Sequence, residues 1–300
     1  MPGGTLVAPV ARSAAREGLR LVFDLFKLRI GISIAVTALA GVAVTPGETS
    51  ALQVAVVGLA VLIASAAAGA FNQYAESDLD SRMQRTRGRA FVTGRLKRHA
   101  GWLALIVALL AGAVGMDAWL VNAVSAMHVF LGAFFYAVVY TLWLKRRTWL
   151  NIVVGGLAGS FAVLAGAAAV APGVPGPLPL AFAFMLFLWT PPHFWSLAIA
   201  NREDYLAAGV PMLPVVVGNA RAARTVCSGA VLLAAASLLP LAFGMGYVYA
   251  AGAVIGGLFF VRESVRLVSD QSRKQAIHTF LASLVQLTLV LAAAIADRLL

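Results

Sequence analysis

A run of oxygen-bearing side chains follows a long apolar stretch, where charged groups are costly. Residues 51–71 contain no charged residue, and Asn72, Glu76 and Asp80 then follow at intervals of four. On an α-helix of 3.6 residues per turn these positions share one face, roughly 6 Å apart along the axis. Such oxygen ligands suit a hard divalent cation such as Mg²⁺, which usually keeps waters and bridging phosphates. The alternative is a solvated helix end whose carboxylates pair with neighbouring arginines.

Basic side chains come directly after this acidic face. They are Arg82, Arg85, Arg87 and Arg89. Guanidinium groups cannot ligate a metal, but they bind phosphate oxygens. Acids for a cation beside bases for phosphate therefore predict a metal–diphosphate site at a membrane surface. Two further basic groups, Lys145-Arg146-Arg147 and Lys27 with Arg29, are interpreted either as determinants of membrane topology or as additional diphosphate ligands.

A second cluster surrounds two prolines in an apolar run. Residues 189–195 read Trp-Thr-Pro-Pro-His-Phe-Trp. Pro191 and Pro192 lack amide hydrogens and predict a kink or break, which a membrane helix tolerates where it is packed or lines a cavity. His193 is ionisable within a span and is therefore a functional candidate, the alternative being a hydrogen-bonded interior histidine. Asp204, beyond this run, either brings a carboxylate to the first cluster or simply ends the helix.

The composition is that of an integral membrane protein. Hydrophobic residues make up 61% of the 300 residues and charged residues 12%, against roughly 45–50% and 25% in soluble domains. Apolar runs predict nine membrane helices, at residues 30–46, 51–75, 100–116, 118–142, 150–171, 178–200, 225–243, 244–261 and 278–297. We expect one membrane domain over residues 1–300, with residues 1–20 as a basic tail. The single cysteine, Cys227, excludes an internal disulfide.

Lysine and arginine alternate between the connections of this nine-helix scheme. Every basic residue except Arg298 lies in one of five segments: up to residue 29, 76–99, 143–149, 201–224 and 262–277. By the positive-inside rule this pattern predicts an all-α bundle with a cytoplasmic N-terminus. The net charge of +11 is thus explained by topology, and we expect no nucleic-acid partner. Polar chemistry is expected on the cytoplasmic side of the lipid bilayer.

These motifs resemble those of the UbiA superfamily of membrane prenyltransferases. Within the superfamily, they are similar to the protohaem IX farnesyltransferase family. Three blocks carry the resemblance: residues 72–89, 140–156 and 189–216. The chain departs from the family pattern at Leu28 and Ala90, where proline is usual, and lacks a proline pair near Ala162.

The resemblance implies roles for particular side chains. Mg²⁺ would be held by a catalytic set of four: Asn72, Glu76, Asp80 and Asp204. The leaving diphosphate would be neutralised by six basic residues: Lys27, Arg29, Arg85, Arg89, Lys145 and Arg146. For a wall that faces the acceptor haem, we take His193 with Trp189 and Trp195.

The activity that the resemblance implies is transfer of the farnesyl group of farnesyl diphosphate to a vinyl group of haem b. Addition of water would complete the reaction, giving haem O and diphosphate. The expected location is the cell inner membrane, with a cytoplasmic active site and a haem A synthase or oxidase-assembly protein as partner. Two alternatives stay open: a UbiA-type enzyme with another aromatic or porphyrin acceptor, and a polytopic transporter whose broken helix lines a substrate path.

Overall fold

A computed structural model describes residues 18–300, and this part of the chain consists of helices and loops without a β-strand. Eight helical segments are long and apolar enough to cross a membrane. They are α3 (Ala51–Ala75), α5 (Ala100–Leu120), α6 with η1 (Ala123–Phe134, Phe135–Leu144), α7 with α8 (Asn151–Gly155, Leu157–Val170), α9 (Pro177–Ala200), α12 with η2 (Asn219–Ala236, Leu239–Phe243), α13 (Tyr247–Ser269) and α14 (Arg273–Leu299).

A ninth span is obtained when two bent segments are counted together. Gly18–Leu25 and α2 (Leu28–Ala43) meet at an angle of 50°. The described residues therefore hold eight or nine spans, which agrees with the predicted all-α bundle. The predicted basic tail, residues 1–20, lies almost entirely outside the described residues. Three short helices occupy polar connections: α4 (Ser77–Arg82), α10 (Arg202–Ala207) and α11 (Leu213–Val217).

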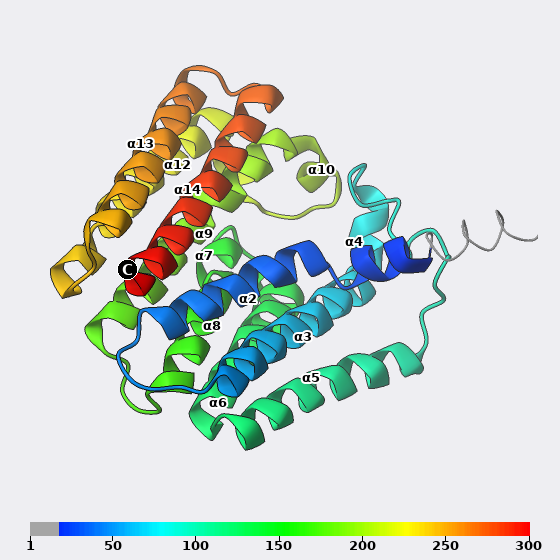
Figure 1. The fold of residues 1–300 in the computed structure, drawn as a ribbon. Helices are drawn as coiled ribbons and strands as arrows, with labels where there is room; N and C mark the ends of the chain where they lie inside the picture. The colour runs from blue at the N-terminus through cyan, green and yellow to red at the C-terminus, as the bar shows by residue number, and fades with distance from the viewer. Residues whose placement is uncertain (1–17) are drawn as a thin grey trace, which may run out of the picture.

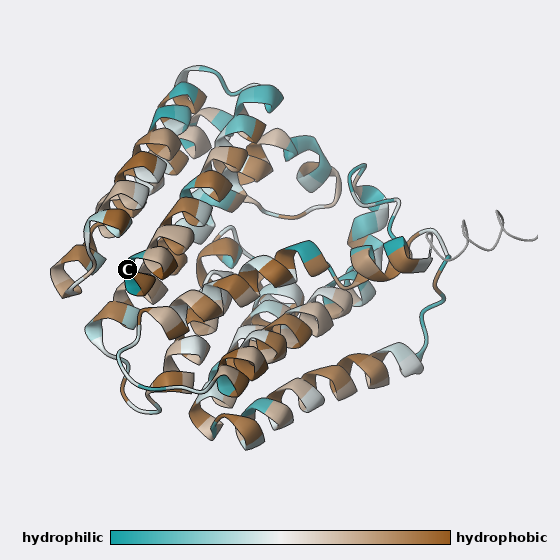
Figure 2. Cartoon of the chain, in the orientation of Figure 1, coloured by the Kyte–Doolittle hydropathy of each residue, from teal (hydrophilic) through white to brown (hydrophobic). Residues whose placement is uncertain are grey.

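The long helices pack side by side (Figure 1). Helix α2 contacts α3 and α8, α14 contacts α13 and α9, and α8 links the two groups by also packing on α9. Figure 2 shows hydrophobic residues along the long helices, whereas hydrophilic residues gather at α4, α10 and the turn between α13 and α14. This distribution suits a membrane bundle whose polar chemistry is concentrated at one end.

The contact between α2 and α8 depends on two glycines. A Cβ atom at Gly41 would lie 2.2 Å from the Val163 carbonyl oxygen, and one at Gly166 would lie 1.9 Å from the Ala38 carbonyl oxygen. Only hydrogen fits at both positions, so the two backbones approach more closely than any other residue would allow. The contact fixes α2, which begins directly after Lys27.

Two predicted features of the spans are wrong. Helix α5 does not end at residue 116 but continues to Leu120, and the carbonyl of the buried Asp117 accepts the helical hydrogen bond of Val121. Helix α9 contains Pro191 and Pro192 and is continuous, so the predicted break is not present. The transporter alternative rested on that break and therefore loses its motivating observation.

Candidate active site

Asn72 and Asp80 belong to consecutive helices, α3 and α4, which are joined at Glu76. The Glu76 amide still donates to the Asn72 carbonyl oxygen at 3.0 Å, and the Asp80 amide donates to that of Glu76 at 2.8 Å. The helical pattern therefore continues through the junction, and the three side chains stay on one side. All three are buried, with only 1–2% of their surface exposed. Carboxylates remain so deeply buried only when they are paired.

Lysines hold the first two members of this set. Lys27 Nζ donates to Asn72 Oδ1 at 2.6 Å, and Lys145 Nζ donates to Glu76 Oε2 at 2.5 Å. Asn72 Nδ2 in turn donates to Glu76 Oε2 at 2.7 Å, so the two pairs are joined. An amide that links two charged groups in this way has no purpose in a simple solvated ion-pair surface. We call these four residues the lysine–amide network.

Asp80 has its own partner. Arg89 Nη1 donates to both carboxylate oxygens of Asp80, at 2.6 and 2.8 Å. The carboxylate is 3% exposed and the guanidinium 22% exposed, so the pair lies at the edge of the buried region. Removing either partner would leave an uncompensated charge in a poorly solvated position.

One carboxylate oxygen in the lysine–amide network lacks a partner. Glu76 Oε1 is buried and accepts no hydrogen bond from the described residues. Such an oxygen costs free energy unless a donor or a cation meets it. It fits a divalent cation, whose other ligands would come from Asn72, Asp80 and phosphate oxygens. Within residues 18–300, no three Asp, Glu, His or Cys side chains are grouped closely enough to hold an ion alone.

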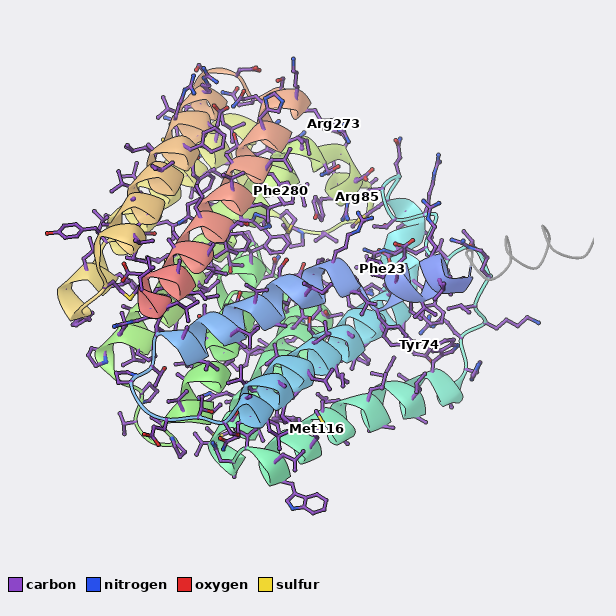
Figure 3. The ribbon with its side chains drawn as sticks, viewed as in Figure 1. Phe23, Tyr74, Arg85, Met116, Arg273 and Phe280 are labelled. Atoms are coloured by element: carbon purple, nitrogen blue, oxygen red, sulfur yellow. The ribbon has the colours of Figure 1, made fainter. Side chains whose placement is uncertain are left out.

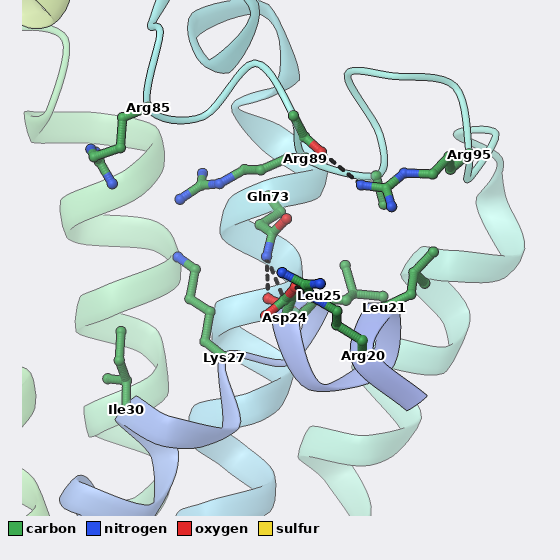
Figure 4. A pocket seen from close by; sticks show the side chains of 12 residues that line it. Arg20, Leu21, Asp24, Leu25, Lys27, Ile30, Gln73, Arg85, Arg89 and Arg95 are labelled. Carbon is green, nitrogen blue, oxygen red and sulfur yellow. Dashed lines mark hydrogen bonds and ion pairs between the residues drawn. The ribbon is translucent and has the colours of Figure 1, made fainter. Parts of the chain in front are cut away.

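A cavity of about 740 Å³ opens beside this network (Figure 4). Its basic lining residues are Arg20, Lys27, Arg85, Arg89 and Arg95, and Asp24 is the acid among them. Figure 4 shows the side chains of Lys27, Arg85 and Arg89 pointing toward the same space. Three converging cations beside a buried carboxylate network suit a multiply charged anion such as a diphosphate.

Lys27 reaches this position through an unusual backbone conformation. Its φ and ψ are 49° and 42°, and it is the one non-glycine residue of the described chain with positive φ. This left-handed conformation costs about 1–2 kcal/mol. The turn is held against α3 because Gln73 Nε2 donates to the carbonyl oxygens of Asp24 and Leu25, at 2.8 and 3.1 Å. Strain that the surroundings maintain in this way is typical of functional sites.

Asp204 meets the loop that follows α4. Its two carboxylate oxygens accept hydrogen bonds at 3.1 Å from the backbone amides of Gln84 and Arg85. The two acid-bearing segments singled out from the sequence are therefore in direct contact. In this arrangement Asp204 positions the loop that carries Arg85 into the cavity.

Two residues predicted to bind diphosphate lie apart from the cavity. Arg146 pairs with Asp78 at 2.8 and 2.9 Å, and both side chains are about half exposed. This guanidinium lowers the pKa of Asp78 through its hydrogen bonds. Arg29 is exposed, with its guanidinium 6.0 Å from the centre of the Phe23 ring. Neither residue lines the cavity.

His193 is packed between aromatic rings at the contact of α9 and α14. Its ring stacks on Trp189 with centroids 4.0 Å apart and on Phe280 at 4.5 Å. His193 Nδ1 lies 2.6 Å from Ser283 Oγ, and that hydroxyl also lies 2.6 Å from the Phe280 carbonyl oxygen. Figure 3 shows Phe280 and Arg85 toward the same end of the bundle.

The other tryptophan of this motif lies elsewhere. Trp195 is buried and packs on Trp149, with ring centroids 6.0 Å apart. Among the described residues it makes no ring contact with His193. Phe280, which the sequence did not single out, is the ring that stacks on His193 from α14.

Sequence reasoning also missed the polar face of η1, a π-helix. Tyr136 Oη accepts a hydrogen bond from Lys27 at 2.9 Å, and Thr141 Oγ1 accepts one from Asn72 at 3.1 Å. Both residues lie in an apolar run, where a tyrosine or threonine is ordinarily attributed to packing. The available signal was the regular spacing of Tyr136, Thr141 and Lys145 by four to five residues.

Comparison with known proteins places this geometry in a family. A model of the UbiA prenyltransferase family matches residues 34–285. The chain belongs to this family. As a UbiA member it is a membrane prenyltransferase with several spans.

Relatives within the UbiA family cover nearly the whole chain. It is 50% identical over 283 residues to "Protoheme IX farnesyltransferase 2" of Paramagnetospirillum magneticum. This alignment covers 94% of this chain and 98% of that protein. It is 44% identical to "Protoheme IX farnesyltransferase 1" of the same organism, covering 93% and 98%. A protoheme IX farnesyltransferase of Granulibacter bethesdensis is 38% identical, covering 90% and 86%.

Solved structures of UbiA homologues share the fold. A UbiA homologue from Archaeoglobus fulgidus, bound to GPP and Mg²⁺, gives a TM-score of 0.75 at 15% identity, covering 93% of this chain and 100% of that one. An apo UbiA homologue from Aeropyrum pernix K1 gives a TM-score of 0.72 at 18% identity, and the alignment covers 91% of this chain and 99% of that one.

Proposed function

We propose that this prenyltransferase transfers the farnesyl group of farnesyl diphosphate to a vinyl group of haem b, giving haem O and diphosphate. The bond between farnesyl C1 and the diphosphate oxygen breaks, and C1 bonds to a vinyl carbon. Water adds to the other vinyl carbon and loses a proton, which leaves a hydroxyethylfarnesyl side chain. The cationic cavity beside the buried Asn72–Glu76 pair supports this proposal, together with relatives that bear the activity in their names.

The leaving diphosphate would bind Lys27, Arg85 and Arg89, which line the cavity. Charge develops on the diphosphate as the C1–O bond breaks, and preorganised cations lower the barrier by stabilising that charge. Lys145 does not line the cavity, and its amine donates to Glu76, so we do not include it among the residues that contact the diphosphate. We therefore propose a smaller diphosphate set than the sequence implied, without Arg29 and Arg146.

A divalent cation, for which we propose Mg²⁺, would be held by Asn72, Glu76 and Asp80. When bound, it would act as a Lewis acid that neutralises the diphosphate. Glu76 offers its unpartnered oxygen, and Asp80 shares its oxygens with Arg89. Asp204 would join a second ion through lone pairs that the amides of Gln84 and Arg85 do not use.

The acceptor would lie against the aromatic group formed by Trp189, His193 and Phe280. In the tautomer whose Nδ1 donates to Ser283 Oγ, Nε2 of His193 would keep a lone pair that accepts a proton or a hydrogen bond. Rings stacked at 4.0–4.5 Å form a rigid aromatic group, against which a porphyrin plane would pack. Apolar helices around the site would exclude water until the carbon–carbon bond has formed.

The setting we propose is the cell inner membrane, with the N-terminus and the active site on the cytoplasmic side. The alternation of basic connections supports this orientation. The product would then pass to an enzyme that oxidises haem O, and a haem A synthase is our proposed partner.

The test is a reconstitution. Purified protein in lipid nanodiscs receives haem b, farnesyl diphosphate and Mg²⁺, and the extracted haems are analysed by mass spectrometry. We expect a haem heavier by one farnesyl group and one hydroxyl group, and no such product when the divalent cations are chelated. Folded protein that consumes farnesyl diphosphate but modifies only a phenolic acid or another tetrapyrrole would refute haem b as acceptor. Folded protein that binds no prenyl diphosphate would refute the proposal altogether.

A further inference from the structure

The lysine–amide network closes on itself through two tyrosines of η1. Lys27 Nζ donates to Tyr136 Oη at 2.9 Å and lies 5.6 Å from the centre of that ring. Lys145 Nζ lies 5.7 Å from the centre of the Tyr140 ring. The Tyr136 and Tyr140 rings stack with centroids 5.8 Å apart and planes 13° apart. Each lysine therefore has one polar partner on α3 or at its end, and one aromatic neighbour on η1.

The π-helical form of η1 makes this closure possible. Tyr136 and Lys145 are nine residues apart, which is about two and a half turns of an α-helix and would place them on opposite faces. A π-helix, with its i→i+5 bonds and roughly 4.4 residues per turn, brings them back to the same face. The Lys145 amide donates to the Tyr140 carbonyl oxygen, five residues earlier, in agreement with this winding.

A neighbouring glycine accommodates the wider helix. A Cβ atom at Gly155 would lie 3.1 Å from the Tyr140 ring, closer than an ordinary contact. The small residue at the end of α7 thus leaves room for the stacked ring. The π-helix is consequently matched by its surroundings, as expected for a feature on which the site depends.

The chemistry of the lysine amine points to the role of Tyr136. An ammonium group has three donors. On Lys27 one hydrogen is directed to Asn72 Oδ1 and a second to Tyr136 Oη, while the side chain lines the cationic cavity. The third hydrogen then remains for an oxygen of a bound anion. Hydrogen bonds to both Asn72 and Tyr136 fix the direction of the third hydrogen, whereas a bond to one of them alone would leave the ammonium group free to rotate.

We propose that Tyr136 is a positioning residue, which acts through Lys27 to orient the ammonium group toward the prenyl diphosphate. This inference rests on the proposed function, because it takes the anion bound in the cavity to be a prenyl diphosphate. Tyr136 itself does not contact the substrate. The hydroxyl improves diphosphate binding by fixing Lys27, and it has no part in binding of the acceptor.

The test is the variant Tyr136→Phe, which keeps the stacked ring and removes the hydroxyl. Binding of farnesyl thiolodiphosphate, an unreactive analogue, is measured by calorimetry in nanodiscs with Mg²⁺ and without haem. We expect affinity to fall roughly fivefold to tenfold, the effect of losing one ordinary hydrogen bond, because the hydroxyl acts on the anion only through Lys27. The KM for farnesyl diphosphate should rise by a similar factor while the KM for haem b stays unchanged. Tyr247→Phe, at a side chain that is 94% exposed, is the matched control.

A double-mutant cycle separates positioning from a general structural effect. In a Lys27→Met background, Tyr136→Phe should cause no further loss of affinity, since the group on which it acts is absent. Three results would overturn the inference. They are unchanged analogue binding by Tyr136→Phe, an additive loss of affinity in the double variant, and an equal rise in the KM for farnesyl diphosphate and the KM for haem b. If the unmodified protein itself failed to bind the analogue, the proposed function would fall instead.

Discussion

Two aspartates of α4 differ in every property that matters for the site. Asp80 is buried, pairs with Arg89 and lies on the same side as Glu76. Asp78 is half exposed and pairs with Arg146 at the surface. Their spacing of two residues puts them on different faces of one helical turn. A matched pair of substitutions therefore separates a site carboxylate from a surface carboxylate in the same short helix.

Asp80→Asn should lower the rate of haem farnesylation by on the order of a hundredfold, because it removes the charge that pairs with Arg89 and that we propose as a ligand of the cation. Asp78→Asn removes an ion pair of the same kind in a solvated position and should change the rate less than twofold. Both rates are measured in nanodiscs at saturating substrates, with size-exclusion profiles to check folding. Similar rates for the two variants would remove Asp80 from the site.

Basic residues can be sorted in the same manner. Arg85→Ala should raise the KM for farnesyl diphosphate by about tenfold or more, because this guanidinium lines the cavity and hydrogen bonds to charged groups contribute ~1.5–3 kcal/mol. Arg146→Ala should leave that KM within a factor of two, since its partner is Asp78. Steady-state kinetics at fixed haem b gives both values. A larger effect for Arg146 than for Arg85 would restore the assignment made from the sequence.

The sequence predicted the acidic face because a spacing of four is recognisable on any α-helix. It could not separate Arg85 from Arg146, since both are basic residues at the same membrane edge. Burial and pairing decide between them, and these depend on contacts over more than sixty residues, such as that of Arg146 with Asp78. Tyr136 was missed for a different reason, because its function depends on a helix period other than 3.6.

Helices position the site through features that hydropathy does not encode. Apolar runs located the spans, but hydropathy ended the run of α5 at residue 116, before Asp117, which is helical and buried. The first signal that would have corrected this is Asn122, whose side chain accepts from the Ser125 amide and caps α6. The winding of η1 and the close approach of α2 to α8 are likewise consequences of neighbouring elements rather than of local sequence.

The approach of α2 to α8 gives a prediction for helix packing. Gly166→Ala should destabilise the protein by about 1–3 kcal/mol, because its methyl group overlaps the Ala38 carbonyl oxygen. Gly112→Ala, in α5, has nothing within 4 Å of the added Cβ and serves as control. Alanine favours a helix over glycine, so the control should unfold at the same or a slightly higher temperature. Thermal unfolding in detergent measures both, and equal losses would show that the contact is not tight.

At the scale of the whole molecule, the cationic cavity and the lysine–amide network lie toward one polar end of the bundle. Figure 3 shows this asymmetry, with Arg85 and Phe23 at one end and Met116 of α5 at the other. The orientation in the membrane therefore decides on which side the diphosphate is bound. Farnesyl diphosphate is a charged, water-exposed headgroup on an apolar chain, so the site must open to the compartment that supplies it.

Cysteine labelling tests the orientation directly. In a Cys227→Ser background, Lys97→Cys and Glu48→Cys place thiols at two exposed loop positions on opposite sides of the predicted membrane. The positive-inside rule predicts that a membrane-impermeant maleimide labels Glu48→Cys on intact cells, and Lys97→Cys only after permeabilisation. The reverse pattern would put the cationic cavity outside the cytoplasm, where the charge of Arg85, Arg89 and Arg95 would contradict the rule. Haem farnesylation in both variants confirms that the labelled protein is folded, because neither position lines the cavity.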